Sequence, residues 1–460
     1  MFLETDVWCP PSYNTSSEPS LLTVAELSPD LDFEHNFARS AKWCPDGSMA
    51  LAHCENRNFQ FLDLQASHPL DHDYFYALQE VDISSEEAIA SLPSWPKNDT
   101  LPQAAPILDF IWYPRATPRE PASFCFVASV RESPVKLLDA STGRLRASYK
   151  IVDHRERQIA PHSLAFNFSA DKLYCGFEDA IEVFDLNCPG EGTRLPTTPS
   201  RKSRDGLKGI ISALAFCPSY DPSYSLFAAG SLAPSSDISS NICLFSEDTG
   251  AKPVGWVGDV KASVMQLAFN PMKPHILYAS FRRHDALYSW DLRGDTTVPL
   301  QIFNRNASET RAMTNQRLRF DIDLGGNWLS VGDQIGDIYF FDLNEESSVE
   351  PEHTEPTEKA STLKYHAHAD AVGSVAFHPL RPLLLSVSGS RHFGIDKCRD
   401  QLQSRSPSSS DDSSSDSSSE EEQKLSETKR TIVKRSSQRP QPSTLENSIK
   451  LWNFEAPTEI

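Results

Sequence analysis

Along this chain, apolar and polar residues alternate in short runs that are separated by turn residues. The stretch Ala262–Leu292 (ASVMQLAFNPMKPHILYASFRRHDALYSWDL) shows three such runs in a row. The turn NPMKP closes the first run, a polar bend joins the second to the third, and the third ends on Trp290-Asp291. A period of two with Pro and Asp at the breaks predicts a meander of β-strands. Because one small sheet is marginally stable alone, we expect the pattern to recur.

The same three-strand pattern occurs seven times along the chain. The units are Phe37–Leu64, Ile107–Asp139, Pro161–Leu186, Ile210–Phe245, Ala262–Leu292, Arg317–Leu343 and Ala371–Phe454. In six units the third strand closes on an apolar residue followed by Asp or Asn, namely Leu62-Asp63, Leu138-Asp139, Phe184-Asp185, Trp290-Asp291, Phe341-Asp342 and Trp452-Asn453. The spacing scatters around the ~40–50 residues of propeller blades, and the closing dipeptide is typical of WD repeats. The sequence therefore predicts an all-β fold, a seven-bladed WD-repeat β-propeller.

The repeats divide the chain into four segments. Residues 1–36 contain one strand-like stretch, Leu21–Leu27, which we expect to supply the outer strand of the last blade, since little chain follows the final dipeptide. Residues 37–394 form blades one to six and the first part of blade seven, and residues 448–460 form its last strand and the C-terminus. Residues 395–447, rich in Ser and acids and then basic, are predicted to be a disordered insert in the last blade.

Both halves of the insert carry candidate signals. Six serines precede an acid by three residues, a spacing that suits acidophilic kinases: Ser408, Ser409, Ser413, Ser417, Ser418 and Ser419. Phosphorylation there would deepen the negative charge. The basic run Lys429–Arg439 fits a nuclear import signal or an RNA-contacting arm. A solvated linker explains each half at least as well.

Composition limits the compartment and the partners. The nine cysteines are scattered and form no C-x-x-C pair, which favours buried thiols in the cytosol or nucleus over disulfides or zinc. No apolar run is long enough to span a bilayer, and no signal sequence is expected. A formal net charge of -20 argues against sequence-blind coating of nucleic acid but allows a local basic site.

Motifs for catalysis are missing. The chain has no G-x-S-x-G elbow, no phosphate-cradling G-x-x-x-x-G-K and no H-E-x-x-H, so we expect no enzymatic activity, no cofactor and no metal site. His366 and His368, in YHAHADAV, stand just before the first strand of the seventh unit. Because many WD repeats carry a structural His at this place, we interpret them as core hydrogen-bonding residues.

Charged loops divide between the two faces of the predicted propeller. Loops that enter a first strand, and loops that join second and third strands, share one face, here called the entry face; the remaining loops form the turn face. The entry face receives Arg131, Arg155, Arg157, Lys208, Arg282, Arg283, His284, Asn315, Gln316 and Arg317. The turn face receives acidic loops such as Ser246–Gly250 and Asn344–Lys359. Arg and amide side chains suit phosphates and unstacked bases, so we predict RNA binding on the entry face; solvated loop charges and an acidic peptide partner are the alternatives.

Seven motifs outside the generic WD pattern resemble the telomerase Cajal body protein group of WD-repeat proteins. They are NFARSAKWCPDGS (Asn36–Ser48), TGRLRAS (Thr142–Ser148), PHSLAF (Pro161–Phe166), YCGF (Tyr174–Phe177), GIISALAF (Gly209–Phe216), DALYSWDLR (Asp285–Arg293) and TNQRLRFDID (Thr314–Asp323). The similarity is collinear over roughly residues 36–393 and 448–454. The resemblance implies a nuclear, non-catalytic scaffold that binds small Cajal-body RNAs and telomerase RNA, while related fungal members are linked to pre-mRNA splicing.

Two hypotheses from different classes follow. The first is a scaffold that binds a small nuclear RNA, of the Cajal-body type or telomerase RNA, and helps ribonucleoprotein assembly or nuclear localisation. It would act as a monomeric propeller within a complex of ribonucleoprotein or splicing proteins, away from membranes. The second is a protein-only adaptor in pre-mRNA splicing or chromatin complexes, with the insert as a phospho-regulated docking arm. Propellers serve both uses, so the fold alone does not decide.

Overall fold

The computed structural model describes most of the chain. The described residues are 9–25, 27, 30–62, 100–200, 202–203, 205–219, 225–233, 240–247, 252–305, 314–344, 355–393 and 442–456. Within them the regular structure is all β, and no helix long and apolar enough to cross a membrane is present. The chain forms two compact units, Met1–Ser390 with Thr444–Ile460, and Arg391–Ser443. In the second unit His392 and Ser443 pair in an antiparallel bridge; the six candidate phosphorylation serines lie outside the described residues.

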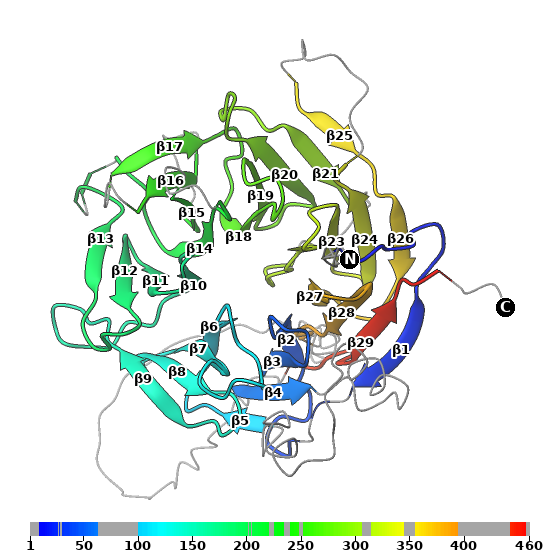
Figure 1. The fold of residues 1–460 in the computed structure, drawn as a ribbon, viewed down its shortest axis with the longest axis horizontal. Helices are drawn as coiled ribbons and strands as arrows, with labels where there is room; N and C mark the ends of the chain where they lie inside the picture. Colours follow the sequence, from blue (N-terminus) through cyan, green and yellow to red (C-terminus); the bar gives the residue numbers. More distant parts are fainter. Residues whose placement is uncertain are drawn as a thin grey trace, which may run out of the picture. The chain divides into compact units, whose positions relative to one another are not determined.

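The strands of the first unit form seven sheets around a central axis (Figure 1). The first sheet contains β2 (Ala38–Trp43), β3 (Ala50–Cys54), β4 (Asn58–Leu62) and β5 (Thr100–Pro102). The second contains β6 (Ile107–Trp112), β7 (Cys125–Val130), β8 (Val135–Asp139) and β9 (Leu145–Tyr149). The third contains β10 (Ser163–Phe166), β11 (Lys172–Phe177), β12 (Ala180–Asp185) and β13 (Thr193–Pro196). The fourth contains β14 (Ile211–Phe216), β15 (Leu226–Ser231), β16 (Ile242–Ser246) and β17 (Pro253–Val257).

The remaining sheets complete the ring. The fifth contains β18 (Val264–Phe269), β19 (Ile276–Phe281), β20 (Ala286–Asp291), β21 (Gln301–Asn304) and β25 (Thr357–Lys359). The sixth contains β22 (Asp321–Ile322), β23 (Trp328–Gly332), β24 (Asp337–Asp342) and β26 (Leu363–His366). The seventh contains β27 (Val372–Phe377), β28 (Leu383–Ser388), β29 (Ile449–Asn453) and β1 (Ser20–Ala25). The predicted seven-bladed β-propeller is confirmed.

The seventh sheet is built from both ends of the described chain. Strand β1 pairs antiparallel with β29, and Leu21 lies opposite Trp452. Before β1, the ring of Tyr13 packs edge-on against Phe377 and Phe454, with centroids 5.1 and 5.8 Å away. The N-terminal segment therefore covers the outer edge of β29, which would otherwise expose unpaired backbone groups.

The fifth sheet has a strand that the sequence analysis did not foresee. Strand β25 pairs in parallel with β21, and Ile302 lies opposite Glu358. It belongs to the connection between β24 and β26, which we had treated only as an acidic loop. Parallel strands are joined by a crossover rather than by a tight turn, so the sequence has no local turn signal that predicts β25. The connection of the sixth sheet thus covers the outer edge of the fifth.

Buried side chains fill the spaces between neighbouring sheets. Seven clusters of buried apolar residues are present among the described residues, and each joins two adjacent sheets. Trp290 is fully buried between the fourth and fifth sheets, and Phe110 between the first and second. Burying a side chain of this size contributes about 1.5–3 kcal/mol. The core is thus a ring of inter-sheet packing, and the inner strands are free to line the channel with polar groups.

The inner strands are irregular near their starts. In five sheets the pairing with the second strand skips one residue, and the skipped residues are Arg39, Leu108, Ser212, Met265 and Gly373. Such a β-bulge re-aims a side chain and often borders a functional site. Arg39, Leu108 and Met265 all line the same hollow at one end of the channel.

Of the two histidines expected to be core residues, His366 is not one, since its side chain is 65% exposed and lies 2.8 Å from Asp337, whereas His368 has the expected structural role. Its side chain is buried, its Nε2 lies 2.8 Å from Ser386 Oγ, and Trp452 Nε1 donates to the same oxygen at 2.8 Å. Its Nδ1 lies 3.0 Å from Glu446 Oε1. These bonds tie the entry to β27 to strands β28 and β29. Glu446, which the sequence analysis assigned to the insert, therefore contacts the seventh sheet in the first unit.

Candidate nucleic-acid interface

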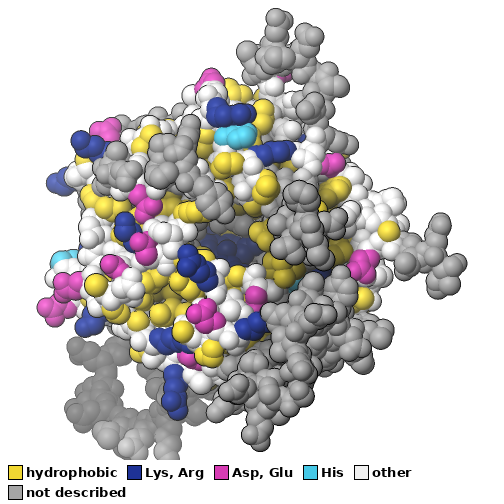
Figure 2. Space-filling view, viewed as in Figure 1, with side chains coloured by type: hydrophobic (Ala, Val, Ile, Leu, Met, Phe, Trp, Pro, Cys, Tyr) yellow, Lys and Arg dark blue, Asp and Glu magenta, His cyan; other side chains and the backbone are white. Residues whose placement is uncertain are grey.

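A hollow of about 300 Å³ lies at the entry-face end of the channel, and we call it the mouth pocket. It is lined by Arg39, His53, Ile107, Leu108, His162, Leu232, Met265, Arg282, Asn315, Gln316, Arg317 and Arg319. These residues come from the first six sheets or the loops that lead into them. The space-filling view shows a central hollow with dark-blue Lys and Arg side chains at its base, and a rim of mixed charge (Figure 2). The geometry gathers cationic, amide and apolar groups around one space.

Four of the predicted RNA-binding residues meet in the mouth pocket. Arg282 comes from the turn between β19 and β20, and Asn315, Gln316 and Arg317 come from the connection that leads to β22. The Gln316 side-chain amide donates to the carbonyl of Gly389 at 2.8 Å, which anchors this connection to the seventh sheet. Loops far apart in the sequence are therefore held against one another by specific contacts.

Arg283 and His284 lie beside the mouth pocket. Arg283 has a left-handed backbone, φ 59°, and its Nε donates to Asn315 Oδ1 at 2.9 Å. Both residues line a small adjoining hollow between the fifth and sixth sheets. Buried Arg305 fixes this turn, since its guanidinium donates to the carbonyls of His284 and Asp285 at 2.7 and 2.8 Å and to Gly332 at 2.9 Å. These hydrogen bonds from Arg305 hold the turn that carries Arg283 and His284 in place.

The other four predicted residues are not among those that line the mouth pocket. Arg131 is exposed directly after β7. Arg155 and Arg157 are exposed in the connection between β9 and β10, where Arg157 forms a 2.8 Å ion pair with Asp153. Lys208 is half-buried before β14. Their connections belong to the entry face, but these side chains would meet only a ligand that extends beyond the mouth.

Sequence reasoning missed four lining residues: Arg39, His53, His162 and Arg319. Three of them, Arg39, His162 and Arg319, lie in or beside inner strands, whereas the prediction drew its candidates from loops. Because successive side chains of an extended chain alternate between two sides, Arg317 and Arg319 in RLRFD, just before β22, lie on the same side. That two-residue spacing was the available signal.

An ion-pair network connects side chains of different sheets across the channel. Arg319, just before β22 of the sixth sheet, donates from Nη2 to Asp109 Oδ1 of β6 at 3.0 Å, and Lys42 Nζ of β2 lies 3.8 Å from the same oxygen. The Leu164 backbone N–H donates to Asp109 Oδ2 at 3.1 Å. Burial alone would raise the pKa of Asp109, but Lys42, Arg319 and Arg317 bring it below its usual value. Four sheets are thus connected through one carboxylate.

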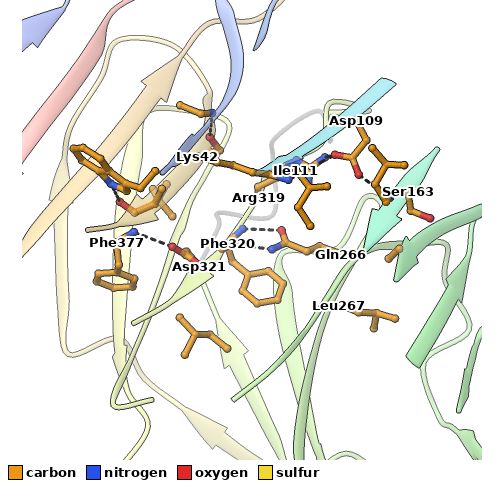
Figure 3. A pocket seen from close by; sticks show the side chains of 18 of the residues that line it. Lys42, Asp109, Ile111, Ser163, Gln266, Leu267, Arg319, Phe320, Asp321 and Phe377 are labelled. Atoms are coloured by element: carbon orange, nitrogen blue, oxygen red, sulfur yellow. Dashed lines mark hydrogen bonds and ion pairs between the residues drawn. The ribbon is translucent and has the colours of Figure 1, made fainter. Parts of the chain in front are cut away.

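A second hollow, of about 400 Å³, opens on the turn-face side of this network; we call it the turn-face hollow (Figure 3). Gln266 exchanges two hydrogen bonds with the Phe320 backbone, at 2.8 and 3.1 Å, and Asp321 accepts from the Phe377 N–H at 2.8 Å. Burial raises the pKa of Asp321 to about 7. The described lining of this hollow therefore holds carboxylates as well as cations.

The described residues that line the mouth pocket include no carboxylate. Burial, with help from Arg319 and Arg39 against the opposing effect of Asp109, lowers the pKa of Arg317 to about 10. Burial and nearby arginines also hold the pKa of His53 well below its usual value, and that of His162 below it. Both histidines are therefore neutral at pH 7, and the positive charge of the mouth pocket comes from the arginines.

The fold and this site define a WD-repeat β-propeller protein with a basic channel mouth. No family model matches the chain. The chain is 29% identical over 382 residues to the protein named Telomerase Cajal body protein 1 of Mesocricetus auratus, covering 83% of this chain and 63% of the relative. It is 29% identical over 362 residues to the Mus musculus protein of the same name, covering 78% and 60%. The resemblance seen in the sequence motifs is confirmed.

A relative with a different name is also similar. The Guanine nucleotide-binding protein negative regulator 1 of Schizosaccharomyces pombe is 26% identical over 315 residues, covering 65% of this chain and 68% of the relative. The chain spans about three fifths of the length of the two Cajal body relatives above. Similarity therefore extends over most of this chain, and the relatives have sequence beyond the matched part.

Proposed function

We propose that this protein is a nuclear, non-catalytic WD-repeat scaffold that binds a small nuclear RNA of the Cajal-body type or telomerase RNA. In this proposal it contacts ribonucleoprotein proteins and helps to assemble or localise the particle. The mouth pocket and the surrounding entry face bind the RNA, with Arg282, Asn315, Gln316 and Arg317 at the centre. RNA that extends outward from the mouth pocket is bound by Arg131, Arg155, Arg157 and Lys208.

The observation that carries the proposal is the set of four arginines around a pocket whose described lining lacks a carboxylate. Arginine offers a planar fork to phosphate oxygens and a flat surface for stacking with unpaired bases. Asn315 and Gln316 add donors and acceptors that suit the edges of bases. The names of the relatives, which refer to telomerase and Cajal bodies, favour this class of RNA and the nucleus.

One observation favours a second candidate, the protein-only adaptor in splicing or chromatin complexes. Large apolar side chains are exposed in the turns that follow the inner strands of the third, fifth, sixth and seventh sheets: Phe168, Met272, Leu324 and Leu380. These turns all belong to the turn face. Apolar side chains repeated on one face are typical of protein contact, so the two candidate functions use opposite faces.

Crosslinking of the full-length protein to RNA in its own cells, followed by sequencing, tests the proposal. We expect a narrow set of small nuclear RNAs, and we expect their recovery to fall at least roughly tenfold in an Arg282→Ala, Arg283→Ala double variant. Both side chains are exposed, so the fold should be retained.

A matched control removes two exposed cations from the turn face of the fourth and fifth sheets, Lys252→Ala with Arg293→Ala. It causes the same change in net charge and should leave RNA recovery unchanged. Protein partners without RNA above background would favour the adaptor. Equal losses in the two double variants would show a response to net charge alone and would contradict an entry-face site.

A further inference from the structure

The mouth pocket holds more positive charge than its neighbours neutralise. Its four arginines are accompanied by Lys42 in the channel network. Among the described ion pairs, Glu55 lies 3.4 Å from Arg39, and Asp109 serves Arg319 and Lys42 together. Within this set of described residues, two carboxylates face five cations, which leaves an excess of three positive charges.

Arg317 is half-buried and forms no ion pair among the described residues. Its Nη2 donates to the carbonyl of Ser212 at 3.3 Å, a long bond to a neutral group. The lowered pKa of Arg317 reflects its burial and the nearness of Arg319 and Arg39. A half-buried charge that no carboxylate contacts directly is unfavourable, and a bound anion would reduce that cost.

The shape of the pocket limits the size and chemistry of such an anion. About 300 Å³ is at the lower end of the range for small-molecule sites. Apolar side chains of Leu108, Leu232 and Met265 line part of it, and the amides of Asn315 and Gln316 line another part. A bare phosphate would not contact the apolar side chains and amides, whereas the base and sugar of a nucleoside would.

The size of the charge excess favours a phosphate monoester over a diester. A phosphodiester in an RNA chain carries one negative charge, while a phosphate monoester carries about 1.5–2 at neutral pH and presents three acceptor oxygens. Three oxygens suit several guanidinium groups that approach from different sides. Arg39, Arg317 and Arg319 approach from the first and sixth sheets.

We propose that the mouth pocket binds a nucleoside phosphate monoester, with the phosphate between Arg39, Arg317 and Arg319 and the nucleoside toward Asn315 and Gln316. The group is either the terminal nucleotide of an RNA or a free mononucleotide. The inference rests on the proposed function in so far as both place phosphate at the same arginines. It adds that the centre of the face takes a chain end or a single nucleotide, and that the rest of the entry face takes the RNA chain.

Calorimetric titration of the full-length protein with AMP and with adenosine tests the phosphate requirement. We expect AMP to bind and adenosine to bind at least roughly tenfold more weakly, because charge-assisted hydrogen bonds would be lost. Arg317→Gln should weaken AMP binding roughly tenfold, and Arg39→Gln should also weaken it. The turn-face double variant, Lys252→Ala with Arg293→Ala, should leave the affinity for AMP unchanged. Equal binding of AMP and adenosine, or no effect of either arginine substitution, would overturn the proposal.

Short RNAs that differ only at the 5′ end distinguish the two sources. Tighter binding of a 5′-phosphorylated oligonucleotide than of its 5′-hydroxyl form, lost in Arg317→Gln, assigns the pocket to an RNA terminus. AMP binding with no difference between the oligonucleotides assigns it to a free mononucleotide. AMP binding without crosslinked RNA would refute the proposed function but not the pocket, and crosslinked RNA without AMP binding would refute the pocket but not the function.

Discussion

Next to the turn-face hollow, Lys42 and Arg319 share the carboxylate of Asp109, and Asp321 lies nearby. At the entry-face end, the mouth pocket adds Arg39, Arg282 and Arg317, and its described lining has no carboxylate. Both ends are built from the same inner strands. The charges at the first end bind the sheets to one another, whereas at the other end Arg282 and Arg317 form no ion pair among the described residues and are available to a ligand.

The difference shows how a propeller separates stability from recognition. A cation that is paired inside the channel contributes to holding the ring together, and its loss should be costly. A cation crowded among others contributes little or even lowers stability, and its loss should matter mainly for binding. Arginine is therefore expected to have opposite effects on stability at Arg317 and Arg319, which are two residues apart.

The largest expected effect comes from breaking the paired end. Asp109→Asn removes the only carboxylate within the described network that serves both Arg319 and Lys42. Removing one partner of a buried pair typically costs about 3–5 kcal/mol, because the remaining charge is left buried. We expect a fall of this size in the free energy of unfolding by urea denaturation.

Asp291→Asn is the matched control for that substitution. Asp291 pairs with Arg293 at 2.7 Å, but the Arg293 side chain is 67% exposed. Exposed pairs contribute about 0–1 kcal/mol, so the control should be nearly neutral. Similar small losses in both variants would show that the channel network does not hold the sheets together.

An intermediate effect is expected from His378, which lines the turn-face hollow as a neutral group. Its Nδ1 accepts from the N–H groups of Leu380 and Arg381 at 3.0 and 3.1 Å, and its Nε2 donates to the Gly47 carbonyl at 3.0 Å. Protonation of Nδ1 would lose both accepted bonds. Burial accordingly lowers the pKa of His378 from 6.5 to about 4.

The unfolded chain therefore binds a proton near pH 6.5 that the folded chain binds only near pH 4. The stability contributed by neutral His378 is complete above pH 6.5 and is lost as the pH falls toward 4, by up to about 3 kcal/mol. Asn270 makes equivalent bonds in the fifth sheet, to Met272, Lys273 and Gly326, so His378→Asn is a conservative replacement. We expect urea denaturation to give a shallower pH dependence for His378→Asn than for the native protein between pH 6.5 and 4; parallel curves would contradict this role.

The smallest expected effect is at Arg317, at the entry-face end. Arg317→Gln removes a crowded charge and one long hydrogen bond. The free energy of unfolding should stay within about 1 kcal/mol of the native value or rise, since relief from like charges opposes the lost bond. A loss above about 2 kcal/mol in urea denaturation would assign Arg317 to structure and would remove the contrast between the two ends.

Much of the fold was predictable because the signals are local. Alternating runs, the turn Pro45-Asp46-Gly47 and closures such as Trp290-Asp291 each lie within a few residues of the structure they specify. Strand β25 was not predictable in this way, because its partner β21 lies more than fifty residues away and no hairpin joins them. The same reason kept the Glu446 contact with His368 out of the prediction.

The candidate site was predictable in part. Position in a loop was enough to select Arg282 and the Asn315–Arg317 stretch, and the fold brings these together. Arg39 and Arg319 were missed because a polar residue in an alternating strand is ordinarily assigned to solvent or to a buried exception. In a propeller the inner strand has a third environment, the channel, and only the closed ring creates it.

Because the seventh sheet combines strands from both ends of the described chain, it can be completed only late in translation. Asn447 donates from its side-chain amide to the carbonyl of Asn36 across 411 residues, and β1 finds its partner β29 over a similar span. Translation at about 5–20 residues per second takes on the order of half a minute or more to cover that distance. The first six sheets can pair as they emerge, but β1 must wait for nearly the last residues of the propeller. The moment of ring closure is therefore governed by the ribosome rather than by the speed of strand pairing.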